Sequence, residues 1–150
     1  MLKKILLLCL LISGFEDPSV SAQNTPTDAP KVATLKALKI VFQLTTNDTL
    51  VHKALVKQIQ NALTAAPNAK IEVVCHSNGI EFLTASKTKF AQNITDLRTK
   101  GVEFAACENT LRERKIQKSE IVTDAFFVPS GIIEVVIKQD EGWAYLKANF

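Results

Sequence analysis

Stretches of apolar, β-branched residues recur along this chain and are separated by stretches with a helical period. Runs of this kind, nearly continuous in their hydrophobicity, are typical of strands buried on both faces of a sheet. Three long runs and one shorter run predict four such strands, over residues 39–45, 71–76, 102–107 and 125–128.

Residues with a helical period fill two of the gaps between these strands. In the first gap apolar residues stand at every fourth position, at Val51, Leu55, Ile59 and Leu63, and Pro67 follows as a stop. In the second gap the pattern recurs at Phe90, Ile94 and Leu97, and Gly101 stands where a helix would end. Strands that alternate with helices predict parallel βαβ units, and therefore a three-layer α/β/α sandwich with a mostly parallel sheet.

The C-terminal segment admits two interpretations. In the first, residues 132–137 and 143–146 form a β-hairpin. In the second, Ser130 caps a helix that ends at Gly142, and a strand follows over residues 143–147. Such a helix would bury one face and expose the other to water, with Ile133, Val136 and Ile137 buried and Glu134, Lys138 and Asp140 exposed.

The first 22 residues have the parts of a secretory signal peptide. Lys3 and Lys4 precede an apolar run over residues 5–15, and Val20-Ser21-Ala22 places small residues at the cleavage positions. The run is too short for a bilayer-spanning helix of about 20 residues, which disfavours a retained anchor. We expect cleavage after Ala22, a periplasmic or secreted protein, and no stable membrane span afterwards. The domain organisation expected is a signal peptide at 1–22, a flexible linker at 23–38 and one folded domain at 39–150.

Composition narrows the class of protein further. Removal of the leader leaves 128 of the 150 residues, the size of one domain. A hydrophobic content of 47% with 22% charged residues excludes general disorder. The net charge is +3, and the basic residues are scattered along the chain, which argues against nucleic-acid binding. Cys9 leaves with the leader, and the remaining Cys75 and Cys107 cannot make a disulfide-rich scaffold.

Candidate chemistry is expected beyond the carboxyl ends of the strands, where parallel sheets bind their ligands. Cys107 ends a predicted strand, and Asn109 or Thr110 is expected to cap the helix that follows. A thiol at a helix N-terminus is favoured as thiolate, an effect that the arginines of this helix would strengthen and Glu108 would oppose. The other interpretation is that Cys107 is a small buried hydrophobe.

The other cysteine and the two histidines have more ordinary interpretations. Cys75 is expected to pack in the core, although a disulfide with Cys107 is possible if their strands are neighbours. His76 is either a hydrogen-bonded loop residue or a base for Cys107, and His52 is expected to be exposed. No motif for a metal, a nucleotide or a serine nucleophile is found, so we expect no metal and no cofactor.

From Lys39 onward the chain resembles the DsrE/DsrF-like family of small sulfur-relay proteins. The matching segments are KIVFQLTTND at 39–48, IEVVCHSNGIEFL at 71–83, KGVEFAACENTLRERKI at 100–116 and VPSGIIEVVIKQDEGWAYLK at 128–147. The resemblance implies a Rossmann-like α/β/α sandwich with a mostly parallel five-stranded sheet, which favours the helix-then-strand interpretation of the C-terminus. It also implies a homo-oligomer, a trimer or a hexamer.

The same resemblance implies a role for Cys107. In the sulfur-carrying members, a cysteine after the third strand accepts sulfane sulfur as a persulfide, and Cys107 matches that cysteine. The residues expected to line its cleft are Asn47, His76, Asn78, Gly79, Asn109, Thr110, Arg112 and Ser130. The predicted function is an exported protein that binds or transfers sulfane sulfur, with a donor or acceptor thiol protein or a small anion as partner.

Two points stay open at this stage. The alternative function is a non-catalytic module that binds a small ligand or a protein and in which Cys107 is structural, so the sequence does not decide whether the protein is an enzyme. The sulfur-relay members are cytoplasmic, whereas this chain carries an export signal, which separates it from a pool that keeps thiols reduced.

Overall fold

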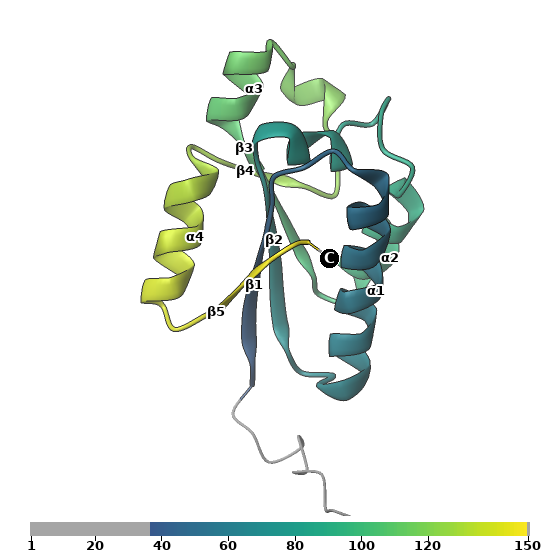
Figure 1. Cartoon of the computed structure of the whole chain (residues 1–150), viewed down its shortest axis with the longest axis vertical. Helices are drawn as coiled ribbons and strands as arrows, with labels where there is room; N and C mark the ends of the chain where they lie inside the picture. Colours follow the sequence, from purple (N-terminus) through teal and green to yellow (C-terminus); the bar gives the residue numbers. More distant parts are fainter. Residues whose placement is uncertain (1–36, 150) are drawn as a thin grey trace, which may run out of the picture.

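Five parallel strands form one twisted sheet at the centre of the molecule (Figure 1). The computed structural model describes residues 37–149, so the predicted signal peptide and nearly all of the predicted linker lie outside the described residues. The strands are β1 (Lys39–Leu44), β2 (Lys70–Cys75), β3 (Glu103–Cys107), β4 (Phe126–Val128) and β5 (Ala144–Lys147). Every neighbouring pair is parallel, in the order β4-β3-β2-β1-β5, which confirms the predicted α/β class.

Helices connect the strands, as the periodicity predicts. They are α1 (Thr49–Ala65), the 3₁₀ helix η2 (Ser77–Phe82), α2 (Ala91–Thr99), α3 (Glu108–Arg114), the 3₁₀ helix η3 (Lys118–Glu120) and α4 (Gly131–Asp140). Asp48 caps α1, its carboxylate accepting the Leu50 N–H at 2.8 Å, and α1 ends before Pro67. The C-terminal segment is the helix followed by a strand, and Gly142 ends that helix with a positive φ of 83°. None of the described helices is long and apolar enough to cross a membrane.

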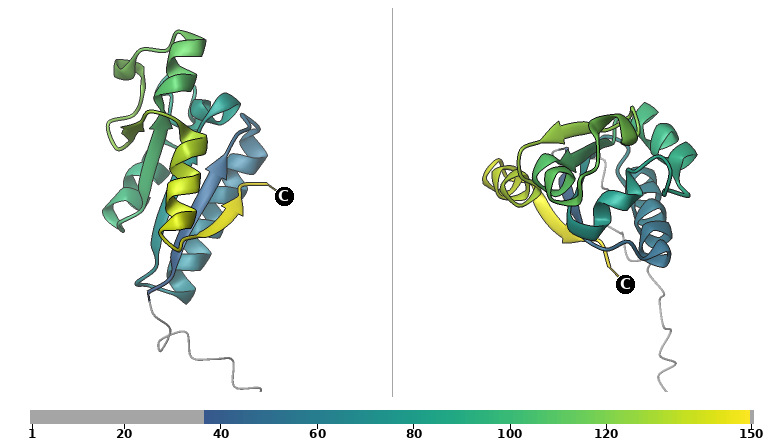
Figure 2. Two further views of the ribbon diagram at one scale, coloured as in Figure 1. Left: turned by 90° about the vertical axis from the view of Figure 1, so that its left-hand side faces the viewer. Right: turned by 90° about the horizontal axis from the view of Figure 1, so that it is seen from above.

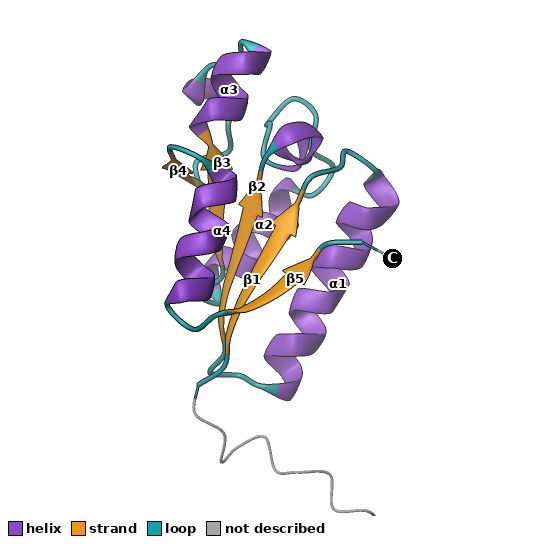
Figure 3. Ribbon diagram, turned by 60° about the vertical axis from the view of Figure 1, so that its left-hand side comes forward, coloured by secondary structure: helices purple, strands orange, loops and turns teal. Residues whose placement is uncertain are grey.

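The path of the chain across the sheet places α4 alone on one face. From β1 the chain steps to β2, β3 and β4 in one direction, and α4 then carries it back past these strands to β5. Because βαβ crossovers are right-handed, a reversed step puts its helix on the opposite face. Figures 2 and 3 show the result, with α1 and α2 covering one face and α4 lying across the other.

The face under α1 and α2 carries the larger core. Its fully buried side chains include Leu44, Leu55, Ile59, Phe82 and Phe104, all with no exposed area. His52 belongs to this core, so the expectation that it is exposed is wrong. Its Nε2 lies 2.8 Å from the Thr46 carbonyl oxygen and its ring packs edge-on against Phe82, because the position on α1 faces the sheet.

The face under α4 has a much smaller core and contains a buried ion pair. Its apolar members are Val41, Val74, Ala105, Val128 and Val135, with Trp143 packed against them. Among them Glu72 on β2 is completely buried. Lys138 Nζ on α4 lies 2.7 Å from Glu72 Oε2 and 4.7 Å from the centre of the Trp143 ring. Lys138 is the counter-charge that Glu72 meets, and no other donor among the described residues reaches either Glu72 oxygen.

This ion pair reverses the predicted orientation of α4. Ile133, Val136 and Ile137, expected on the buried face, are 45–55% exposed, whereas Glu134 and Lys138, expected in water, are turned toward the sheet. The reason is that Glu72 occupies the middle of the face that α4 covers. A buried carboxylate without a counter-charge is costly, so the helix presents Lys138 to Glu72, and all of its aliphatic side chains except Val135 face the outside.

Burial dominates the ionisation of Glu72. It raises the pKa of Glu72 from 4.5 to about 7, although Lys138 acts in the opposite direction. Burial by itself would lower the pKa of Lys138, but its contact with Glu72 outweighs that, and the pKa of Lys138 lies above its ordinary value. A carboxyl whose pKa is raised by folding binds its proton more tightly in the native state. Its contribution to stability is complete below pH 4.5 and is lost as the pH rises through about 7.

We predict that the stability of Glu72→Gln relative to wild type is higher at about pH 8 than at about pH 5. The reason is that an uncharged amide avoids the cost of a buried charge, which the wild-type carboxylate carries at the higher pH. The measurement is the melting temperature of both proteins across this range. The exposed carboxyl Asp140 on α4 supplies the control Asp140→Asn, whose difference from wild type should stay constant. A difference for Glu72→Gln that does not change with pH would contradict the prediction.

Candidate functional site

The sulfur of Cys107 accepts hydrogen bonds from two backbone N–H groups of different chain segments. Gly131 N, at the start of α4, lies 3.2 Å from Cys107 Sγ, and Thr110 N, in the first turn of α3, lies 3.5 Å from it. Cys107 is itself the N-cap of α3, so the expectation that Asn109 or Thr110 caps this helix is wrong. The helix begins one residue after the strand ends, which leaves the thiol as the only side chain in the capping position.

The topology explains why these two segments meet. β3 and β4 are neighbours, and Cys107 pairs with Val128 at the ends of the two strands. The connection after β3 packs on the α1/α2 face, whereas the connection after β4 is α4 on the other face. A point where successive connections leave in opposite directions is the usual ligand site of an open parallel sheet. The Asn109 N–H closes the arrangement by donating to the Pro129 carbonyl oxygen at 3.2 Å.

Cys75 takes no part in this site. It pairs in register with Ala106 on β3, and both face the larger core, so its side chain and that of Cys107 lie on opposite faces of the sheet. Both cysteines are free thiols, and the disulfide between them is not formed even though their strands are neighbours. Complete burial raises the pKa of Cys75, as expected for a core cysteine.

His76 lies at the end of β2, against the start of α4. A Cβ placed on Gly131 would lie 3.0 Å from His76 Cβ, so the two residues are in direct contact. The imidazole nitrogens are both engaged, Nε2 with Gln43 Nε2 at 2.8 Å and Nδ1 with Ser77 Oγ at 3.1 Å. Burial lowers the pKa of His76, and the neutral ring fits the hydrogen-bonded interpretation better than that of a free base.

The 3₁₀ helix η2 supplies another wall of the site. Ser77 has a positive φ of 51°, which is unusual for a residue other than glycine, and its N–H donates to Thr110 Oγ1 at 3.0 Å. Gly79 is required because a Cβ there would lie 2.1 Å from the Leu44 carbonyl oxygen. The glycine lets η2 pack directly on the end of β1.

The remaining predicted residues form the rim of the site. Asn78 accepts a hydrogen bond from Arg114 and Asn109 accepts one from Arg112, so neither arginine is directed to the sulfur by its hydrogen bond. Asn47 donates to Glu81 at 3.4 Å. Ser130 is at the N-cap position of α4, but its side chain makes no capping hydrogen bond. The carboxylate of Glu108, expected to oppose a thiolate, forms an ion pair with Lys118.

The sequence does not predict a functional role for three residues of the site. They are Gln43 on β1, Ser77 and Gly131. Ser77 and Gly131 follow the predicted strands, but both make contacts through backbone N–H groups, which every residue type except proline has. Gln43 would have been recognisable only as a polar side chain within an otherwise apolar strand.

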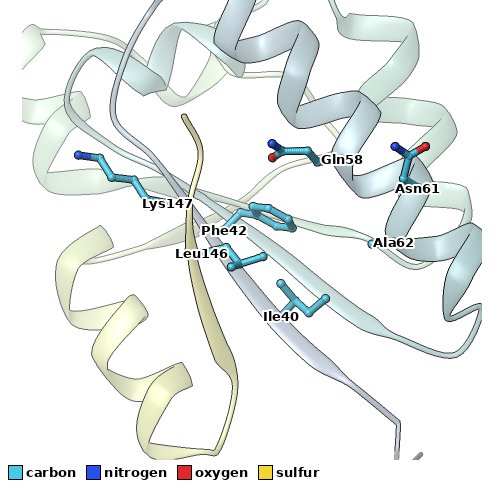
Figure 4. Close-up of a pocket in the computed structure, with 7 residues that line it drawn as sticks. All are labelled: Ile40, Phe42, Gln58, Asn61, Ala62, Leu146 and Lys147. Carbon is cyan, nitrogen blue, oxygen red and sulfur yellow. The ribbon is translucent and has the colours of Figure 1, made fainter. Parts of the chain in front are cut away.

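A cavity of about 320 Å³ lies apart from Cys107, between α1 and the edge strand β5. Figure 4 shows Phe42, Ile40 and Leu146 gathered at its floor, while Gln58 and Asn61 come from α1. Lys147 is the one charged residue among those that line it, and no cysteine or histidine of the described residues is among them. Within residues 37–149 no group of three or more His, Cys, Asp or Glu side chains is placed to hold a metal ion.

Comparison with known proteins identifies the family. Residues 36–148 match the DsrE/DsrF-like family along their whole length. This chain belongs to the DsrE/DsrF-like family. No match was found among curated proteins.

Solved structures agree on the fold of this DsrE/DsrF-like chain. The protein of unknown function MTH1491 from Methanobacterium thermoautotrophicum is 29% identical, with a TM-score of 0.71 over 73% of this chain and 98% of that one. The ychN protein from E. coli is 12% identical, with a TM-score of 0.60 over 75% and 99% of the two chains. BT1422 from Bacteroides thetaiotaomicron, also of unknown function, is 16% identical, with a TM-score of 0.58 over 73% and 93%.

We predict that Gly131→Ala slows the reaction of Cys107 with a small thiol reagent and destabilises the protein by about 1–3 kcal/mol. The added methyl group would contact His76 Cβ at 3.0 Å and Val74 Cγ1 at 3.2 Å, which displaces the N–H that reaches the sulfur. Iodoacetamide kinetics in a Cys75→Ser background measure the first effect and thermal unfolding the second. Gln139→Ala, at an exposed position of α4, is the control. Unchanged kinetics in Gly131→Ala would show that the Gly131 N–H does not influence the sulfur.

Proposed function

We propose that this protein is an exported sulfur carrier that holds sulfane sulfur as a persulfide on Cys107 and passes it to an acceptor thiol. The observation that supports this proposal is the pair of N–H groups from Thr110 and Gly131 that point at one sulfur atom. Donors of this kind stabilise a thiolate, the nucleophilic form, more than a neutral thiol. Membership of the DsrE/DsrF-like family gives the sulfur chemistry as the context.

The proposed reaction balances without a further oxidant. The Cys107 thiolate attacks the sulfane sulfur of thiosulfate or of a polysulfide, a new S–S bond forms, and the old S–S bond breaks. Its electron pair leaves with sulfite or with the shortened polysulfide, and the original thiol proton goes to solvent. An acceptor thiolate then attacks the outer sulfur of the persulfide, and Cys107 departs as thiolate, ready for another cycle.

The burial of Cys107 restricts the donor. The residue is only 4% exposed, so a small inorganic anion reaches its sulfur more readily than a folded donor protein. Once the persulfide has formed, its reactive outer sulfur lies about 2 Å beyond Sγ, the length of an S–S bond. The added atom brings the reactive centre closer to an acceptor thiol, which is the reason for proposing a protein partner at the second step.

We predict that incubation with polysulfide or thiosulfate adds about 32 Da, one sulfur atom, to Cys107. Intact-protein and peptide mass spectrometry measure the adduct. Cys75→Ser should retain it, because Cys75 is buried in the core, and Cys107→Ser should lose it. No adduct on the wild-type protein, or an adduct that persists in Cys107→Ser, would refute the proposal.

The low exposure of Cys107 also supports the second candidate, a non-catalytic binding or assembly module in which this cysteine is structural. The two functions differ in whether the native sulfur can be reached. Modification of native Cys75→Ser protein by a small methanethiosulfonate, but not by a bulky aromatic disulfide, would favour the sulfur carrier. Resistance to both reagents until the protein unfolds would favour the structural role.

Export to the periplasm or secretion is part of the proposal, supported by the leader-like residues 1–22. An oxidising compartment tends to convert free thiols to disulfides. In this fold the two cysteines of the domain point to opposite sides of the sheet, so an internal disulfide would require the sheet to open. This arrangement supports a thiol at Cys107 that stays available outside the cytoplasm.

The proposal also includes a homo-oligomer, in which a second copy covers the outer face of α4. Four aliphatic residues there are 45–60% exposed, namely Ile132, Ile133, Val136 and Ile137. Because Glu134 and Lys138 are turned toward the sheet, these four aliphatic side chains form an exposed patch typical of protein interfaces. The patch lacks charge, so it can pack against a copy of itself.

We predict that the wild-type protein is larger than a monomer in solution and that Val136→Asp shifts it toward the monomer, because a carboxylate would be buried without a partner at the interface. Light scattering coupled to size-exclusion chromatography measures the mass. Gln139→Asp, on the same helix but outside the patch, should leave the mass unchanged. A wild-type protein that is already monomeric would contradict the oligomer.

A further inference from the structure

A line of side-chain hydrogen bonds crosses the sheet from the edge strand β5 to the start of η2. Tyr145 Oη on β5 donates to Gln43 Oε1 on β1 at 2.6 Å. Gln43 Nε2 lies 2.8 Å from His76 Nε2 at the end of β2. His76 Nδ1 in turn lies 3.1 Å from Ser77 Oγ. The spacing of residues along the chain does not indicate this line, because its members come from strands β1 and β5, the residue after β2 and the first residue of η2.

The chemistry of the amide determines which imidazole nitrogen carries the proton. The amide nitrogen of Gln43 can only donate, so His76 Nε2 must accept. The ring is then neutral, with its proton on Nδ1, and Nδ1–H donates to Ser77 Oγ. The Tyr145 hydroxyl supports this orientation of the amide, because it donates to Gln43 Oε1 at 2.6 Å.

The imidazole contacts one of the two segments whose N–H groups reach the sulfur of Cys107 directly, and the other through Ser77. On one side it bonds to Ser77, whose N–H donates to Thr110 Oγ1 at 3.0 Å, and the Thr110 N–H donates to the sulfur. On the other side its Cβ and ring pack against Gly131, whose N–H is the second donor. Neither imidazole nitrogen is left to take a proton from the thiol.

We propose that His76 is a positioning residue for Cys107 whose tautomer is set by Gln43 and Tyr145. The Nδ1–H donor fixes Ser77 in its left-handed conformation, and Ser77 aligns Thr110 with the sulfur. Left-handed backbone is unfavourable for serine, so it persists only where such contacts impose it. This inference rests on the proposed function, because a residue that positions Cys107 has a functional role only if Cys107 is the reactive group.

The first experiment separates the two nitrogens of the imidazole with a matched pair of variants in a Cys75→Ser background. The amide N–H of His76→Asn can replace Nδ1–H as a donor to Ser77, whereas His76→Gln can replace Nε2 as an acceptor but loses that donor. Iodoacetamide should react with Cys107 about tenfold more slowly in His76→Gln, the effect of weakening one hydrogen bond to an ionised sulfur.

His76→Asn should stay within about threefold of the parent rate, because the donor to Ser77 remains. Thermal unfolding of both variants measures the packing lost when the ring is removed, a loss they share. Equal rates for the two variants, or a slower reaction in His76→Asn, would overturn the assignment of Nδ1–H as the positioning donor.

The second experiment reads the tautomer directly. Nitrogen–proton correlation spectra of ¹⁵N-labelled histidine should show the His76 proton on Nδ1 in the wild-type protein, and Tyr145→Phe should introduce the Nε2–H form. A wild-type ring protonated on Nε2, or a Tyr145→Phe spectrum identical to wild type, would overturn the role of Gln43 and Tyr145. Neither measurement involves sulfur transfer, so failure to form a persulfide would refute the proposed function without changing these outcomes.

Discussion

The site depends on one convergence, in which N–H groups from the starts of α3 and α4 meet at the sulfur of Cys107. Each N–H lies in the first turn of its helix, where backbone donors have no partner within the helix. The sulfur supplies that partner, and in return it receives donors that suit a negative charge. The two helices begin side by side only because the chain reverses its path across the sheet after β4. Without that reversal Gly131 would not lie beside the end of β3.

The two faces of the sheet differ in the side chains that they bury. The face under α1 and α2 holds most of the apolar core and buries Cys75 within it. The face under α4 holds few apolar residues and accommodates the polar groups, namely the Glu72–Lys138 pair and the hydrogen-bonded His76. Stability and chemistry are thereby separated by the sheet itself, and the two cysteines cannot meet.

Helix α4 connects several properties that would otherwise look independent. Its first residue binds the sulfur and packs on His76, and its Lys138 neutralises Glu72. Because Lys138 faces the sheet, the isoleucines of the helix and Val136 face outward, whereas Val135 packs inward. In the proposed oligomer, a partner that covers this outer face would lie against the helix whose first residue, Gly131, contacts the sulfur of Cys107. Assembly and the reactivity of the thiol would then be linked through this one helix.

The sequence by itself determined the first four strands, helices α1 and α2, and Cys107 as the leading candidate for chemistry, because buried parallel strands are continuous apolar runs and their carboxyl ends share one edge. The residue pattern left the C-terminal segment open between a hairpin and a helix followed by a strand. Only the tertiary structure decided the rest. Apolar residues occupy most positions of α4, so its sequence does not define one buried face. The buried Glu72 determines which face of the helix turns toward the sheet. Likewise, Cys107 meets Gly131, and His76 meets Gln43, through strand order and backbone N–H groups. Neither is encoded in the spacing of residue types along the chain.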